Sequence, residues 1–155
     1  MRRPVSDAIE NARAAALDLH KALLDATRVE YERDHGPVPS PGMLLRLVSS
    51  DPAFAWLRGL SELIVAFDQL LAMPEIGDRD AAAVRVELED LLSRDARGFR
   101  VPYLAMLQLA PEVVLAHSEL QRTLKVLPAA SLGEVPALLL LRRGWNPPRR
   151  RAPDA

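Results

Sequence analysis

Apolar residues recur at intervals of three and four along most of the chain, and strict alternation of apolar and polar residues is absent. This spacing places apolar side chains on one face of a helix, whereas alternation would indicate a strand. Four long stretches have the helical pattern, namely residues 6–34, 52–72, 78–93 and 111–127. We therefore predict an all-α fold, a single-domain helical bundle with four main helices and no sheet.

Two short polar-proline pairs predict where further helices begin. Ser40-Pro41 and Asp51-Pro52 each open an apolar stretch. Serine and aspartate accept backbone N–H groups at the N-cap, and proline suits the first helical position because no N–H is needed there. We expect a short helix over residues 41–48 ahead of the long helix 52–72, and a second short, proline-initiated helix from Pro102 to Leu109.

The first helix has two apolar sides. Its broad side contains alanines and larger aliphatic residues: Ile9, Ala12, Ala15, Ala16, Leu19, Ala22, Leu23 and Ala26. Leu17, Leu24 and Tyr31 form a second column, which we call the Leu17–Leu24–Tyr31 ridge. A helix with two apolar ridges contacts two neighbours. The second neighbour is either another part of this chain or another copy of it.

Two positions outside the first helix have expected packing roles. Gly59 lies near the edge of the broad apolar face of helix 52–72, where it lets another helix approach closely. Asp68 lies at the border of the same face, and we expect it to pair with an arginine. Glu87, Glu89 and Asp90 are assigned to the exposed face of helix 78–93.

The apolar pattern weakens after Leu127-Pro128. We divide the chain into a helical bundle, residues 1–128, and a C-terminal extension, residues 129–155. Ser131 with Glu134 three residues later indicates one more short helix within residues 131–142. The following segment, RRGWNPPRRRAPDA, is predicted to be a mobile basic tail because proline and like charges oppose compaction.

Charge is distributed unevenly between these two parts. The chain has a net charge of −1, but residues 142–155 contain five arginines and one aspartate. The remaining body is mildly acidic, which makes nucleic acid an unlikely partner of its surface. The tail alone has the composition of an anion-binding segment, with Trp145 as a base-stacking residue. Its candidate anion-binding residues are Arg142, Arg143, Arg149, Arg150 and Arg151.

Cysteine is absent, which excludes disulfides, thiolate metal sites and cysteine nucleophiles. The two N-terminal arginines have no apolar stretch behind them, so no secretory signal is indicated. The longest apolar runs have five residues, as at 137–141, far fewer than the about 20 residues that span a bilayer. We expect a soluble cytoplasmic protein without membrane contact.

Chemistry-bearing motifs are few. Glu32 and His35 have the E-x-x-H spacing of di-iron bundles, but in a single copy near a helix end. No serine has the G-x-S-x-G context, and no glycine-rich loop is present. His20 and His117 lie on or beside apolar faces, where a hydrogen-bonded core histidine is the ordinary interpretation. We therefore assign no catalytic residue, metal ligand or cofactor, and the sequence favours a protein that is not an enzyme.

Two stretches carry a resemblance to a known family. Residues 20–71, HKALLDATRVEYERDHGPVPSPGMLLRLVSSDPAFAWLRGLSELIVAFDQLL, and residues 110–120, APEVVLAHSEL, resemble a family of small helical bacterial proteins. The resemblance covers roughly residues 15–127 and leaves the tail outside. It implies a helical fold and no particular activity.

The leading functional hypothesis is a non-catalytic helical protein that acts through protein contact. We expect self-association through Leu17, Leu24 and Tyr31, with residues 137–141 contributing. The expected partner is a second copy of the chain, in a homo-oligomer such as a dimer. The other possible partner is a different protein.

Two alternatives remain open. The first is a small-molecule or metal site in the bundle around His117, with Tyr31, Tyr103 or Trp56. The second is contact of the arginine-rich tail with an anion or nucleic acid.

Overall fold

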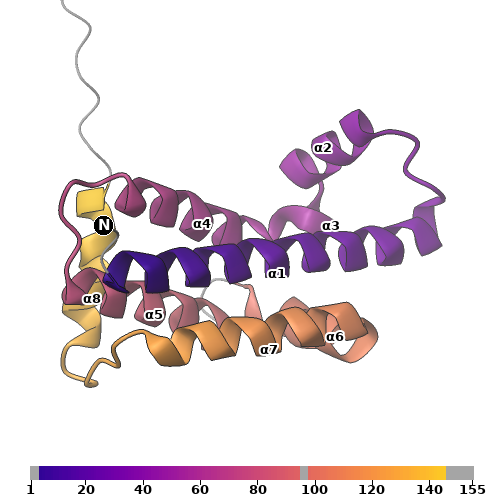
Figure 1. Ribbon diagram of the computed structural model, residues 1–155. Helices are drawn as coiled ribbons and strands as arrows, with labels where there is room; N and C mark the ends of the chain where they lie inside the picture. Colours follow the sequence, from indigo (N-terminus) through magenta and orange to yellow (C-terminus); the bar gives the residue numbers. More distant parts are fainter. Residues whose placement is uncertain (1–3, 95–97, 146–155) are drawn as a thin grey trace, which may run out of the picture.

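The computed structural model describes residues 4–94 and 98–145, which form helices joined by turns, without a strand (Figure 1). The all-α prediction is confirmed for these residues, and none of their helices is long and apolar enough to cross a membrane. The elements are α1 (Pro4–His35), α2 (Pro41–Ser50), α3 (Pro52–Ala55), α4 (Arg58–Leu71), α5 (Asp78–Ser93), α6 (Arg100–Leu109), α7 (Pro111–Val126), α8 (Val135–Leu141) and the 3-10 helix η2 (Arg142–Trp145).

Helix α1 organises the molecule. This helix runs along the length of the molecule, with α4 on one side and α5 and α7 on the other in Figure 1. It contacts α3, α4, α5, α6 and α7. Its buried residues are Ile9, Ala12, Ala15, Ala16, Leu19, Leu23, Ala26 and Thr27. The predicted broad apolar face therefore packs into the core. The helix begins at Pro4, two residues before the expected start, and Asp7 lies in its first turn.

The predicted starts of α2 and α3 are confirmed. Ser40 Oγ accepts from the Met43 backbone N–H at 3.2 Å, and Asp51 Oδ1 accepts from the Ala53 N–H at 2.8 Å. Pro41 and Pro52 follow these caps as the first helical residues. The Asp51 N–H also donates to the Leu47 carbonyl, so one aspartate ends α2 and starts α3.

The prediction of one continuous helix over residues 52–72 is wrong. The chain turns at Trp56 and Leu57, which separates α3 from α4. The Leu57 N–H donates to the Phe54 carbonyl at 3.1 Å. This bond joins residues three positions apart, as in a 3-10 turn, and it ends α3 after one turn. Both Phe54 and Leu57 are buried, so the break is associated with two large side chains entering the core on either side of it.

Two close contacts attach α4 to its neighbours as predicted. A Cβ added to Gly59 would lie 3.0 Å from Leu91 Cδ1 of α5, so the glycine permits this approach. Arg13 Nη1 lies 3.1 Å from Asp68 Oδ1 and joins α1 to α4. Helix α5 starts at Asp78, as expected, and its N-cap Gly77 donates its N–H to Asp80 Oδ2 at 3.0 Å.

The short helix predicted within residues 131–142 is present as α8, but the prediction of a mobile tail starting at Arg142 is wrong for residues 142–145. These residues form η2, and Trp145 is buried. Its indole Nε1 donates to Asp80 Oδ1 at 3.0 Å, and its ring lies 6.3 Å from that of Phe67. The rest of the predicted tail, with Arg149, Arg150 and Arg151, lies outside the described residues.

The assignment of Glu87 to an exposed face is also wrong. Its side chain is only 1% exposed, and Arg142 Nη1 of η2 lies 3.7 Å from its Oε2. Helix α8 packs against α5, so the C-terminal segment covers a face that the first 128 residues alone leave open. Glu89 of the same helix is exposed, as expected.

Replacement of Trp145 tests whether the C-terminal segment is part of the fold. We expect Trp145→Ala to lower the free energy of unfolding by about 3–5 kcal/mol, because it removes a buried indole and leaves a cavity. Urea denaturation followed by circular dichroism measures the change. Leu132→Ala is the matched control, since Leu132 is 93% exposed and its loss should change stability by about 0.5 kcal/mol or less. Equal stability of the two variants would contradict this assignment.

Candidate functional site

A surface pocket of about 540 Å³ lies where α5, α6 and α7 meet. Its lining residues are Glu89, Leu92 and Ser93 of α5, Arg100, Tyr103, Leu104 and Leu107 of α6, and His117 and Gln121 of α7. We call it the α5–α6–α7 pocket. It contains His117, the histidine that the sequence placed on an apolar face.

A row of aromatic rings leads from the core to this pocket. Ring centroids are 5.1 Å apart for Trp56 and Phe99, 5.3 Å for Phe99 and Tyr103, and 5.7 Å for Tyr103 and His117. Three of the four candidate residues are thus linked through Phe99, which the sequence analysis did not single out. Phe99 follows Gly98, whose positive φ of +68° turns the chain just before α6.

The fourth candidate, Tyr31, belongs to a different cluster. Its ring is stacked on His35 with centroids 4.1 Å apart and lies 5.6 Å from the ring of Phe54 in α3. His35 is the last residue of α1, in keeping with its expected place near a helix end, and it is exposed. Tyr31 therefore packs against α3 and does not line the α5–α6–α7 pocket.

Tyr103 and His117 are joined by a hydrogen bond between the phenol oxygen and Nδ1 of the imidazole. Burial raises the pKa of Tyr103 and lowers the pKa of His117, so both groups are neutral at neutral pH. A buried phenol needs an acceptor for its proton, and Nδ1 provides one. The remaining ring proton of His117 is then on Nε2, which makes this nitrogen a donor.

Donors dominate the polar edge of the pocket. Arg100 Nη1 donates to the Ser93 carbonyl oxygen at 2.8 Å, a bond that uses one of the five N–H groups of its guanidinium. Glu89 is the carboxylate of the pocket, and its Oε1 accepts from Arg85 Nε at 2.8 Å. The charge of Glu89 is therefore balanced from outside the pocket, and the positive charge of Arg100 dominates the edge.

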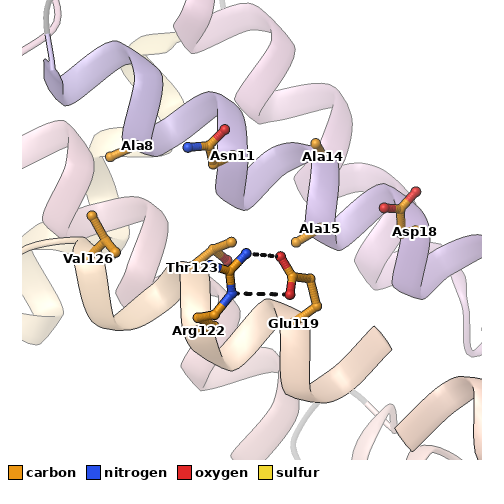
Figure 2. Close-up of a pocket in the computed structure, with 9 residues that line it drawn as sticks. All are labelled: Ala8, Asn11, Ala14, Ala15, Asp18, Glu119, Arg122, Thr123 and Val126. Atoms are coloured by element: carbon orange, nitrogen blue, oxygen red, sulfur yellow. Dashed lines mark hydrogen bonds and ion pairs between the residues drawn. The ribbon is translucent and has the colours of Figure 1, made fainter. Parts of the chain in front are cut away.

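A second cavity, of about 300 Å³, lies between α1 and α7 and is drawn in Figure 2. Small side chains of α1 form one wall, among them Ala8, Ala14 and Ala15. Figure 2 shows two hydrogen bonds joining Arg122 to the carboxylate of Glu119 on α7, and these bonds lower the pKa of Glu119. The two exposed charges satisfy each other, so this groove has less binding chemistry than the α5–α6–α7 pocket.

His20 and Ser61 form a serine–histidine contact that the sequence could not reveal, because the residues are 41 positions apart. His20 Nε2 lies 2.8 Å from Ser61 Oγ, and burial lowers the pKa of His20. Ser61 Oγ also donates to the Leu57 carbonyl at 3.3 Å. A nucleophilic serine also needs a third group that orients its histidine, and no such hydrogen-bond partner of His20 is present among the described residues. The contact joins α1 to α4 and fits the expected hydrogen-bonded core histidine.

The predicted interface and anion-binding residues lie elsewhere. Leu17 and Leu24 are half-buried and pack against the core of the same chain, and their contact with another subunit stays a prediction. Arg142 is paired with the buried carboxylate of Glu87. Arg143 is exposed and, with Arg142, borders a depression beside α4.

Metal ligands do not gather in the part of the chain that the structure describes, where no group of three or more histidine, aspartate or glutamate side chains is placed to hold an ion.

No family model matches the chain, and comparisons with curated proteins and with solved structures find no significant match. The resemblance to a family of small helical bacterial proteins stays a prediction.

The two half-buried histidines predict a pH dependence of stability. Burial lowers the pKa of His20 and His117 from the ordinary value of 6.5, so between the folded and unfolded pKa values the unfolded chain binds more protons. The free energy of unfolding should therefore rise with pH through this window and fall on acidification below about 6.5. Urea denaturation across a pH series measures the slope.

The double variant His20→Gln/His117→Gln should flatten this profile, whereas His35→Gln, which changes the exposed third histidine, should leave it unchanged. A wild-type profile that is flat, or that rises on acidification through the same window, would show that neither imidazole is kept neutral by the fold.

Proposed function

We propose that the protein is a non-catalytic, single-domain helical bundle with four main helices that acts through contact with a second copy of the same chain. The proposal is supported by five exposed apolar side chains on the successive helices α6 and α7. They are Val101, Leu104, Leu109, Val114 and Leu115, and we call them the α6–α7 apolar surface.

The exposure of these side chains is high for their type, between 43% for Val114 and 73% for Leu115. Single exposed aliphatic residues are ordinary on protein surfaces, but a concentration of them on neighbouring elements marks a contact site. Here five lie on two successive helices that are joined at Ala110. Contact with another molecule would remove this apolar area from water.

A second copy fits this surface for two reasons. In a two-fold dimer the same surface of each copy faces its counterpart, and an apolar surface is suited to burial against itself. Residues 100–118 also contain one positive and one negative side chain, Arg100 and Glu112, so two copies do not repel each other through a net charge.

The Leu17–Leu24–Tyr31 ridge is a weaker candidate for the main contact. Its side chains are half-buried against the core, and the ring of Tyr31 packs against Phe54. In the proposed dimer, the ridge at most adds to the contact that the α6–α7 apolar surface makes. A cytoplasmic, bacterial setting belongs to the same proposal and is supported by the cysteine-free sequence and by the family resemblance alone.

Substitution of the α6–α7 apolar surface tests self-association. We expect the wild-type protein to form a dimer that dissociates on dilution, and Val101→Gln/Leu115→Gln to be monomeric at the same concentrations, because polar side chains there lose the apolar burial. Sedimentation equilibrium measures the association constant. Both positions are exposed, so stability should change by about 0.5 kcal/mol or less per site.

Val126→Gln is the matched control, since Val126 is 72% exposed at the other end of α7. It should associate like the wild-type protein. A wild-type chain that stays monomeric at the highest concentration, or a double variant that dimerises with unchanged affinity, would overturn the proposal.

A further inference from the structure

We propose that the α5–α6–α7 pocket is a binding site for a small organic carboxylate with an apolar body, held by His117 Nε2 and the guanidinium of Arg100. This inference goes beyond self-association, because it assigns a ligand class to a cavity that the dimer proposal does not need.

The first donor is fixed in place by a buried partner. Tyr103 is 1% exposed, and its hydroxyl is hydrogen-bonded to His117 Nδ1. The two nitrogens of an imidazole point in different directions, so Nε2 is turned away from Tyr103. His117 is half-buried and lines the pocket. Its Nε2–H is therefore a preoriented donor, which a carbonyl or carboxylate oxygen on a ligand can accept.

The second donor supplies charge. Arg100 is positioned by its bond to the Ser93 carbonyl and keeps further N–H groups for a ligand. Charge-assisted hydrogen bonds from a guanidinium to a carboxylate are about twice as strong as neutral ones. Because Glu89 is already paired with Arg85, the pocket edge favours an anion over a cation.

The apolar body of the ligand is indicated by the other walls. Leu92, Leu104 and Leu107 line the pocket together with the edge of the aromatic row. A volume of about 540 Å³ is within the range of small-molecule sites, about 300–1,000 Å³. Inorganic anions would leave these leucines in contact with water, whereas an aromatic or aliphatic acid would cover them.

Benzoate is a suitable probe, with benzamide as a neutral analogue of the same shape and benzylamine as a cationic one. Full-length protein labelled with ¹⁵N would be titrated with each compound. Long-range ¹H–¹⁵N spectra, which report the histidine ring nitrogens, should show the Nε2–H tautomer of His117 in the free protein. We expect saturable shifts of the His117 signals with benzoate and at least about tenfold weaker binding of benzamide and benzylamine.

Two variants should weaken benzoate binding at least about tenfold: Arg100→Gln and His117→Leu. Because His117→Leu leaves the buried Tyr103 hydroxyl without its acceptor, the double variant Tyr103→Phe/His117→Leu removes both partners and protects the fold. Arg79→Gln and His35→Leu are the matched controls, since both residues are exposed and line no part of this pocket.

Three results would overturn the proposal. They are benzoate titrations that leave the His117 signals unmoved, benzamide or benzylamine binding as tightly as benzoate, and unchanged benzoate affinity in both the Arg100 and the His117 variants. Leu104 belongs to both the pocket and the α6–α7 apolar surface, but the outcome is separable from self-association because Val101 and Leu115, which test the dimer, do not line the pocket.

Discussion

Close packing against the small side chains of α1 is the constraint on which the rest of the structure depends. Ala12 and Ala16 are fully buried, so neighbouring helices pack directly against α1 at these positions. Alanine allows this approach at no cost in helix propensity. Because α1 contacts α3, α4, α5, α6 and α7, its small residues set the positions of helices that do not follow one another in sequence.

The candidate site depends on this packing. Helices α6 and α7 are joined by a single residue, Ala110, and both contact α1. Their placement brings Tyr103 opposite His117 and sets the rings of Phe99 and Trp56 behind them. The pocket thus results from the packing of α6 against α7. The hydrogen bond from Tyr103 to Nδ1 of His117 leaves Nε2 as the donor nitrogen of the imidazole.

Features of the structure that depend on neighbouring residues were predicted from the sequence. Proline after a capping side chain marked the starts of α2 and α3, and helical periodicity identified the buried face of α1. Features set by distant residues were missed or misplaced. Glu87 is buried beside Arg142 of η2, and the contact of His20 with Ser61 joins two helices. No periodicity encodes such pairs. His117 and its partner Tyr103 were candidates from the sequence, whereas Arg100, which lines the same pocket, and Phe99, whose ring contacts Tyr103, were not.

The most direct measurement of the central claim compares two alanines of the same helix. Ala16 is fully buried and Ala14 is exposed, so Ala→Leu changes helix propensity little at either site and differs in what the new side chain meets. Equilibrium urea unfolding should show that Ala16→Leu loses about 1–3 kcal/mol of stability, from overpacking, while Ala14→Leu stays close to the wild-type protein. Equal stability of Ala16→Leu and the wild-type protein would contradict the account, because α1 would then have room that close packing does not allow.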